Sequence, residues 1–326
     1  MNKLNLLRFE DVTPINVASG MDATMKTFYE KTLLENARAT AVFSPLGKHV
    51  PMKGKKCEFR KFNTFPKATT PLTEGVIPSG EKFGMTTVEI ETSQHGDYVA
   101  ISDRLQLESF DDVIYGATEE MGAAEGETFD ILTRNKILTG TNVVYAPVGT
   151  TAVTSRSALT AKAIITPELI NKVATWFKKN HVPKFDGYWV WVIHPSQSYD
   201  LRESDAWKDF HKYDDVAPIF NGEIGTLHGF RFIEDPNVKI YTGDEGGASG
   251  VAVYASMALG KDSFGVLDPE GEGMEMIIKD KSEIGGPLEQ FSTIGYKFCH
   301  GAKILYQERI IRVETGSTLC AEDSSN

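Results

Sequence analysis

Residues 111–139 constrain the fold more than any other stretch, because they predict a single helix of about eight turns. Ser109 can cap this helix, Asp111 and Asp112 place negative charge beside the first-turn amides, and Gly140 follows as a stop signal. One continuous side of the helix consists of residues spaced three or four apart: Ile114, Ala117, Met121, Ala124, Thr128, Ile131, Asn135 and Leu138. We therefore expect a helical strut roughly 40 Å long.

The middle of this predicted helix is rich in small residues. They are Gly122, Ala123, Ala124 and Gly126. Glycine weakens an isolated helix, but a surface without bulky side chains lets another backbone approach closely. We expect another segment to cross the helix at this point.

The overall composition is that of a soluble globular protein. The chain has 326 residues, of which 41% are hydrophobic and 24% charged, so one large or two ordinary domains with a real core are expected. The longest apolar runs, residues 188–193 and 251–259, are far shorter than the roughly 18 residues that cross a membrane. Residues 1–20 contain no compact apolar stretch, so no secretory signal and no membrane association are predicted.

Charge and cysteine content narrow the function classes further. The 34 basic and 45 acidic residues give a net charge of −11, which argues against charge-driven nucleic-acid binding. Cys57, Cys299 and Cys320 match neither a disulfide framework nor the paired spacing of a zinc site. We expect free thiols, although a link between subunits through Cys57 or Cys320 stays open.

The sequence predicts no catalytic, cofactor-binding or metal-binding residues. Its histidines lack the spacing of a helical metal site; they are His49, His95, His181, His194, His211, His228 and His300. His194 follows an apolar run and precedes Pro195, where α/β enzymes place catalytic groups, but no G-x-S-x-G elbow or activated cysteine accompanies it. Residues 222–229 and 243–250 miss the glycine patterns that bind phosphate.

Residues 53–96 contain a ribbon that cannot form a core of its own. Two predicted strands, at 56–62 and 85–92, are joined by residues 63–84, which hold three prolines and three glycines. Such a long loop is uncommon inside a compact domain, and an isolated two-stranded ribbon is marginal in water. The ribbon therefore either closes over a site or lies on a neighbouring copy. Its basic cluster favours the acidic surface of another subunit over DNA: Lys53, Lys55, Lys56, Arg60 and Lys61.

The segments around the long helix have simpler interpretations. Residues 1–20 carry too many apolar side chains for a solvated tail and predict an arm that needs a surface. Residues 22–38 predict an amphipathic helix, and residues 96–103 predict a strand that leads into the long helix. Residues 141–163 are small, polar and irregular, which is typical of a connector.

The following region predicts an α+β layer. Thr166 and Pro167 form a helix start, and Pro183 marks the end of that helix. The apolar run 188–193 favours a central strand. The remaining predictions are a short helix around 196–202, an exposed stretch at 205–215, strands at 230–234 and 251–259, and one or two long strands in 295–314.

Short motifs along nearly the whole chain resemble one protein family. In chain order they are KTLLENAR (31–38), EFRKF (58–62), PLTEG (71–75), GDYVAISD (96–103), EGETFDILTR (125–134), LTGTN (138–142), IHP (193–195), FNGEIG (220–225), LGKD (259–262) and AKIL (302–305). With these motifs the chain resembles the major capsid proteins of tailed bacteriophages with the HK97-type fold, and specifically the N4-gp56 capsid family.

The resemblance implies an α+β, HK97-like capsid fold. It assigns residues as follows: N-terminal arm 1–20, helix and connector 21–52, extended β-ribbon loop 53–96, peripheral domain with the long spine helix 97–150 and 290–315, axial α+β domain 151–289, and C-terminal tail 316–326. The family has no catalytic residues that could be transferred to this chain.

The resemblance also implies a structural function in the virion. Copies of the chain would assemble in the host cytoplasm into hexamers and pentamers that close an icosahedral head around double-stranded DNA, without sequence-specific DNA contacts. Separate scaffold, portal and decoration proteins would be further partners. From the ribbon we predict six intersubunit contact residues: Phe59, Arg60, Phe62, Val88, Glu89 and Ile90.

Two other functions remain open at this point. The first is an α+β enzyme with residues 53–96 as a lid over a site near His194. The second is another structural protein of a virion, such as a decoration or tail component, which would bind neighbours without closing a shell.

Overall fold

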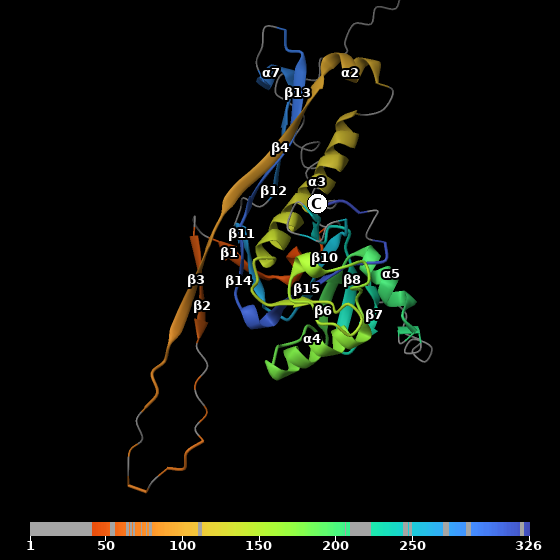
Figure 1. Ribbon diagram of the computed structural model, residues 1–326. Coiled ribbons are helices and arrows are strands. Elements are labelled where there is room, and N and C mark those ends of the chain that lie inside the picture. The colour runs from red at the N-terminus through yellow and green to blue at the C-terminus, as the bar shows by residue number, and fades with distance from the viewer. Residues whose placement is uncertain are drawn as a thin grey trace, which may run out of the picture. The chain divides into compact units, whose positions relative to one another are not determined.

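The computed structural model describes residues 41–52, 56–62, 65, 67, 69–72, 74–75, 77, 80–109, 113–205, 207–208, 223–243, 247, 250–269, 274–284, 288–319 and 323–326. They form a mixed α+β fold that divides into two compact units (Figure 1). The described part of the first unit comprises residues 94–109, 113–127, 274–284 and 288–299, and the second unit holds the rest. The predicted arm at 1–20 and helix at 22–38 lie outside the described residues.

A seven-stranded sheet forms the centre of the second unit. Its order is β5-β15-β10-β6-β8-β7, with β9 paired to β10. The bounds are β5 (Val143–Tyr145), β6 (Trp189–Ile193), β7 (Glu223–Leu227), β8 (Phe230–Glu234), β9 (Ile240–Tyr241), β10 (Val253–Leu259) and β15 (Ile310–Thr315). Every residue of β6 is buried, and the strand lies between antiparallel β10 and parallel β8. The predicted central strand is confirmed, because a strand covered on both faces needs a continuous apolar run.

Helix α4 (Pro167–Lys179) covers one face of this sheet. The Thr166 hydroxyl accepts the Leu169 amide at 3.3 Å, so the predicted start signal is confirmed. The buried side of α4 places Phe177 against Trp189 and Phe230, with ring centroids 5.5 Å apart in both pairs. Such aromatic packing typically contributes about 1.5–3 kcal/mol for each fully buried side chain.

The helix after β6 and the stretch beyond it differ in how well they were predicted. Helix α5 (Pro195–Glu203) lies where a short helix was expected. The next stretch, 205–215, was expected to be exposed and is described only at 205, 207 and 208. There Trp207 is buried and its ring meets that of Phe232 edge-on, so the prediction is wrong at this residue. The charged residues on either side of Trp207 made the stretch look solvated, although this aromatic side chain is buried.

The opposite face of the central sheet packs on a smaller sheet and on the end of a helix. The smaller sheet has the order β1-β11-β14, with bounds β1 (Lys48–Met52), β11 (Phe264–Pro269) and β14 (Ala302–Ile304). Val190 and Val192 of β6 share a core with Phe264, Ile137 and Phe43. Among the described residues the unit also contains three short 3-10 helices: η1 (Ser44–Leu46), η2 (Arg156–Ala158) and η4 (Gln307–Arg309).

The long helix is present as α3 (Val113–Ile137), but its buried side is not the predicted one. Of the expected stripe, Ala124 and Asn135 are exposed. Beside the apolar Met121 and Ile137, the buried side contains five polar residues: Thr118, Glu125, Asp130, Thr133 and Arg134. The pattern failed because carboxylates and threonines normally mark a solvated face. The Gly140 amide donates to the Ile137 carbonyl at 3.0 Å, so the predicted stop is confirmed.

A short helix that was not predicted precedes α3. Helix α2 (Asp103–Glu108) is capped by Ser102, whose hydroxyl accepts the Leu105 amide at 3.3 Å. Ser109, expected to cap the long helix, ends α2 by donating its amide to the Leu105 carbonyl at 2.9 Å. The acidic residues at 111 and 112 lie outside the described residues.

Two buried carboxylates on α3 have environments that favour their neutral form. Asp130 accepts the amides of Phe43 and Ser44 at 2.8 and 2.9 Å, which fixes the chain just before β1. Burial raises the pKa of Asp130 to about 6 in spite of these hydrogen bonds. Glu125 is fully buried, and neither of its oxygens has a hydrogen-bond partner in the described structure. Burial raises the pKa of Glu125 to about 8.

The first unit contains a three-stranded sheet of order β12-β13-β4. Its elements are β4 (Ser93–Ser102), β12 (Met274–Lys279), α7 (Lys281–Ile284) and β13 (Phe291–His300). One side of β13 is buried through Ser292, Ile294 and Phe298. The strand predicted at 96–103 is therefore confirmed as part of β4.

The two units group the residues differently from the division expected from the sequence. Residues 310–315 were assigned with 97–150, and β15 does pair with β5 (Val143–Tyr145), but both strands lie in the central sheet of the second unit. Residues 274–279 were assigned with 151–289, but β12 pairs with β13 in the first unit. Residues 295–314, predicted to form one or two long strands, are divided among three sheets, because Gly301 and the turn at η4 redirect the chain twice.

We expect the substitution Glu125→Gln to change how stability depends on pH. The folded pKa of Glu125 is raised, so folding favours its protonated form, and stability is lost as pH rises through about 8. Between pH 6 and 9 the unfolding free energy of the wild-type subunit should fall by about 2–3 kcal/mol more than that of the variant. Urea unfolding at several pH values measures this difference.

The exposed residue Glu127, also on α3, provides the matched control. Glu127→Gln should leave the wild-type pH dependence unchanged, since no burial penalty is removed. Equal slopes for wild type and Glu125→Gln would show that Glu125 is ionised at no cost in the folded subunit.

Candidate assembly surfaces

The β2–β3 ribbon is the first candidate surface. Strands β2 (Lys56–Phe62) and β3 (Met85–Glu91) pair antiparallel in continuous register, from Lys56 opposite Glu91 to Phe62 opposite Met85 (Figure 1). They form a two-stranded sheet of their own, as predicted. Because side chains alternate along a strand, the ribbon has two distinct faces.

The inner face of the ribbon is turned toward strands β11 and β14 of the same unit. It carries Cys57, Phe59 and Lys61 of β2 and Thr86, Val88 and Ile90 of β3. Phe59 packs against Gly265 of β11 so closely that an added Cβ there would lie 2.9 Å from its ring. Ile90 is only 2% exposed. Phe59 and Ile90 therefore anchor the ribbon on its own chain, and we call this anchored part of the inner face the root of the ribbon.

Polar contacts reinforce this root. Lys61 Nζ lies 3.1 Å from Glu308 Oε1 and 4.2 Å from the Tyr306 ring centroid. Lys303 Nζ donates to the Glu89 carbonyl at 3.0 Å. Partial burial would raise the pKa of Glu308, but its own backbone amide and Lys61 lower it below the usual value. Exposed ion pairs are worth about 0–1 kcal/mol, so these contacts orient the root more than they stabilise it.

The outer face of the ribbon is uncovered. It carries Lys56, Glu58, Arg60 and Phe62 of β2 and Met85, Thr87, Glu89 and Glu91 of β3. Lys56 Nζ lies 2.5 Å from Glu91 Oε1, and Phe62 is 59% exposed. This face mixes both charges with exposed apolar side chains, which suits contact with another protein.

The six predicted contact residues are divided between these faces. Phe59, Val88 and Ile90 lie on the inner face, where Ile90 is buried and the other two are half-buried against their own chain. Arg60, Phe62 and Glu89 lie on the outer face and are exposed. That all six contact a neighbouring subunit stays a prediction, and in this conformation only the outer three present their side chains.

The loop beyond the ribbon exposes further apolar side chains. The rings of Phe62 and Phe65 lie 5.1 and 5.7 Å from that of Phe83, and each of the three is more than half exposed. Farther out, Leu72 is 78% and Ile77 93% exposed. Contiguous exposed apolar surface on a soluble protein marks an interaction site.

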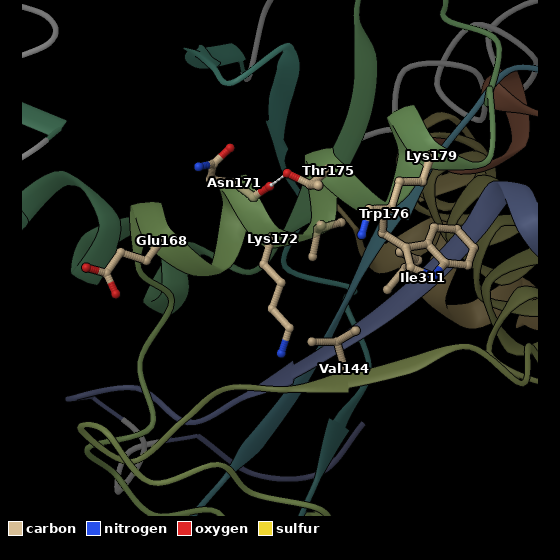
Figure 2. A pocket seen from close by; sticks show the side chains of 9 residues that line it. Val144, Glu168, Asn171, Lys172, Thr175, Trp176, Lys179 and Ile311 are labelled. Atoms are coloured by element: carbon tan, nitrogen blue, oxygen red, sulfur yellow. Dashed lines mark hydrogen bonds between the residues drawn. The ribbon is translucent and has the colours of Figure 1, made fainter.

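A groove between α4 and the edge strand β5 is the second candidate surface (Figure 2). It encloses about 440 Å³ and continues into a second hollow of about 320 Å³ that shares Val144, Glu168 and Lys172. Val144 and Ile311 form its apolar floor, and Trp176 lines one end. Figure 2 shows Lys172 extending from α4 toward Val144, whereas Glu168 points away. The sequence analysis did not identify this groove.

The first unit has exposed apolar residues of its own. On β4, Tyr98 is 69% and Val99 45% exposed, although neighbouring side chains point to opposite faces. Leu107 at the end of α2 and Leu288 before β13 are 84% and 72% exposed. Strand β4 is also an edge strand among the described strands of this sheet.

His194, the alternative catalytic candidate, has a structural role in α5. Its Nδ1 accepts the Ser196 amide at 3.2 Å, and its own amide donates to Gln197 Oε1 at 3.1 Å. The ring stacks on Tyr254 at 4.8 Å. Burial lowers the pKa of His194, and the nearby Asp323 partly opposes this effect. A neutral His194 is thus the helix cap.

The surroundings of His194 do not form a catalytic triad. The Ser196 hydroxyl donates to Asp323 at 2.8 Å, and Asp323 also accepts the Tyr254 hydroxyl. His194 Nδ1, 4.0 Å from the same carboxylate, is used by the Ser196 amide. Serine and histidine therefore do not form the hydrogen bond that activates a nucleophile. Sequence spacing contained no signal for Asp323, which lies more than a hundred residues away.

The described residues contain no group of three or more histidine, cysteine or acidic side chains that could hold a metal ion. Cys57 and Cys299 are free thiols, and Cys320 lies outside the described residues. In the part of the chain that the structure covers, no helix has both the length and the apolar character to cross a membrane.

Comparison with known proteins places these surfaces in context. A sequence model of the family described as phage capsid protein matches residues 85–268, which is more than half of the chain. No curated protein is significantly similar in sequence.

Solved capsid structures share the fold at low sequence identity. The Cyanophage Pam1 capsid has a TM-score of 0.66 and 12% identity, covering 94% of this chain and 95% of that chain. The capsid of Ralstonia phage GP4 has a TM-score of 0.65 and 17% identity, covering 86% and 88%. The capsid of Cyanophage P-SCSP1u has a TM-score of 0.64 and 15% identity, covering 85% and 88%. At these identities the likeness establishes the fold, and the family match establishes that this chain belongs to the phage capsid protein family.

Proposed function

We propose that this chain is the major capsid protein of a tailed bacteriophage, with an HK97-type fold close to that of the N4-gp56 family. Copies assemble into hexamers and pentamers of an icosahedral head that encloses double-stranded DNA. The observation that carries the proposal is the ribbon, whose root is packed on its own chain while its outer face and loop are uncovered.

The exposed apolar side chains offer binding energy for assembly. Covering an exposed leucine, isoleucine or phenylalanine contributes about 1.5–3 kcal/mol before the entropy of association is subtracted. Phe62, Phe65, Phe83, Leu72 and Ile77 together offer several such contributions at each contact. In a closed shell every copy makes the contact, so modest interfaces reinforce one another.

The remaining parts of the proposal concern location and partners. The protein is a virion component, and assembly takes place in the host cytoplasm. Scaffold, portal and decoration proteins are separate chains. A net charge of −11 suits a capsid that encloses DNA without binding it tightly, since the DNA must leave the capsid during infection.

The proposed roles along the chain follow the family plan. Residues 1–20 act as the arm and 53–96 as the extended loop. The first unit with the start of α3 supplies the peripheral domain, and the central sheet of the second unit supplies the axial domain. We propose Arg60, Phe62 and Glu89 as the ribbon residues that contact a neighbour.

The alternatives receive less support. An enzyme with a lid over His194 would need that side chain to be available, but its ring nitrogen caps α5 and its ring stacks on Tyr254. A decoration or tail component would bind neighbours without forming a shell alone. Size-exclusion chromatography followed by electron microscopy of the purified chain separates a shell from both alternatives.

Deleting residues 66–80 should give a folded subunit that does not assemble. The deletion removes exposed loop residues and leaves the root contacts of Phe59 and Lys61 in place. Circular dichroism should show a cooperative melting transition close to that of the wild type, and electron microscopy should show no closed particles.

A linker variant separates the effect of the loop's length from the effect of its side chains. Replacing residues 66–80 by a Gly/Ser linker of equal length should also prevent assembly, because the apolar side chains are lost. Normal particles from either variant would refute the role proposed for the loop.

Substituting His194 should affect stability rather than an activity. His194→Ala removes the cap of α5 and should lower the unfolding free energy by about 1 kcal/mol, as measured by urea denaturation. His194→Asn keeps an acceptor for the Ser196 amide and should recover much of this loss. Equal losses for both variants would mean that the cap is not what His194 contributes.

A further inference from the structure

One end of the central sheet brings several turns of the chain together. Strands β6, β8 and β15 begin at this end, and β10 ends there. Hydrogen bonds join the turns: the Trp189 amide donates to the Gly229 carbonyl at 2.9 Å, and the Lys261 amide donates to the Pro183 carbonyl at 3.1 Å. All of these residues belong to the second unit, so one sheet fixes their positions relative to one another.

Basic side chains follow one another across this end of the sheet. Lys184 lies in the turn before β6, Arg231 is the second residue of β8, Lys261 follows β10, and Arg309 directly precedes β15. We call these four residues the basic strip. Adjacent strands lie about 4.8 Å apart, so four neighbouring strands give a strip roughly 15 Å long. Lys184 and Lys261 are exposed, and Arg231 and Arg309 are half-buried.

Contacts with carbonyl groups and aromatic rings hold the charges of the strip in place. Arg309 Nη1 donates to the Lys261 carbonyl at 3.0 Å, and the Arg309 guanidinium lies 3.9 Å from the Tyr306 ring centroid. Lys184 Nζ lies 4.6 Å from the Trp189 ring centroid. Such contacts orient a cation but do not neutralise it, because none of the partners carries a negative charge.

The positive charge of the strip is not cancelled by neighbouring carboxylates. Within the described residues, no carboxylate forms an ion pair with Lys184, Lys261 or Arg309. Two acidic residues share these turns, Asp186 and Asp262, but neither pairs with the strip. The chain as a whole has a net charge of −11, so its composition did not reveal this local excess of positive charge.

A phosphate backbone matches a line of fixed cations. Successive phosphates of one DNA strand advance about 3.4 Å along the axis of the duplex, so a strip of roughly 15 Å spans about four of them. Contacts of this kind position a protein on DNA without reading the sequence.

The aromatic rings beside the strip favour a duplex over unpaired bases. Proteins that bind single strands stack the bases on open aromatic rings. Here the Tyr306 ring already contacts two cations, Lys61 and Arg309, which lie 4.2 and 3.9 Å from its centroid. Trp189 is only 3% exposed. Neither ring can therefore serve as a stacking platform.

We propose that the basic strip is a contact surface for the phosphate backbone of double-stranded DNA. This inference rests on the proposed function, because it assigns one surface of the capsid protein to the DNA that the capsid encloses. The contact is weak, since the acidic excess elsewhere on the chain opposes the approach of DNA. A weak contact that does not depend on sequence lets the enclosed DNA move along the surface and leave.

Binding of a short duplex at several salt concentrations tests the strip. Unassembled subunits, identified by sedimentation, are titrated into a labelled duplex of about 20 bp, and fluorescence anisotropy measures Kd. The wild-type Kd should rise about a hundredfold between about 50 and 200 mM NaCl, as expected for about four phosphate contacts. The double variant Lys184→Gln, Lys261→Gln should bind about tenfold or more weakly at the lower salt concentration, with a salt slope smaller by about 2.

A second double variant removes the same charge outside the strip. Lys162 and Lys172 are exposed residues of the second unit, and neither belongs to the turns at this end of the sheet. The variant Lys162→Gln, Lys172→Gln should bind the duplex as the wild type does. Circular dichroism confirms that both double variants fold. Equal losses in both would overturn the strip assignment, because binding would then follow net charge alone.

Two further ligands identify the partner. A single strand of the same length should bind more weakly than the duplex, and polyglutamate should compete poorly with it. Tighter binding of the single strand would refute the preference for a duplex, and effective competition by polyglutamate would assign the strip to an acidic protein surface instead.

The outcome for the strip is separable from the outcome for the proposed function. If the wild-type chain forms particles but its unassembled subunits do not bind the duplex, the strip assignment fails and the proposed function stands. If the purified wild-type chain forms no particles, the proposed function itself fails.

Discussion

The contact between Phe59 and Gly265 is the constraint on which the functional surfaces depend. A two-stranded ribbon has no core of its own, so its direction is defined only where it touches a larger body. A glycine on β11 lets the aromatic ring approach the sheet backbone, and Lys61 then reaches Tyr306 and Glu308. The base of the ribbon is thus fixed, although the outer face and the described loop residues are exposed to solvent.

This base divides the ribbon into an inner face that packs on its own subunit and an outer face that is exposed. Alternation along β2 and β3 turns Phe59, Val88 and Ile90 inward and leaves Arg60, Phe62 and Glu89 outside. The inner residues stabilise the single chain, and the outer ones gain little until another surface covers them. A structural protein that must first fold alone and then assemble needs both sets on the same strands.

Local signals in the sequence predicted local structure well. The Thr166–Pro167 start of α4, the apolar run of β6 and the proline-rich ribbon each depend on neighbouring residues. The predictions that failed concern features that depend on residues far apart in the sequence. The buried side of α3 contains Glu125 and Asp130. Asp130 accepts a hydrogen bond from the Phe43 amide, a distant group that no spacing on the helix reveals. The groove beside α4 likewise arises only when β5 and β15 meet across more than a hundred residues.

The placement of β15 affects when the chain can fold during its synthesis. β15 lies between β5 and β10 in the central sheet, and Tyr306 and Glu308, which hold Lys61, are made only shortly before it. During synthesis, strand β6 can pair with β10 only after β10 has been made. The ribbon gains its contacts with Tyr306 and Glu308 later still. A polypeptide that ends before Tyr306 consequently lacks both a central strand of this sheet and the side chains that hold Lys61.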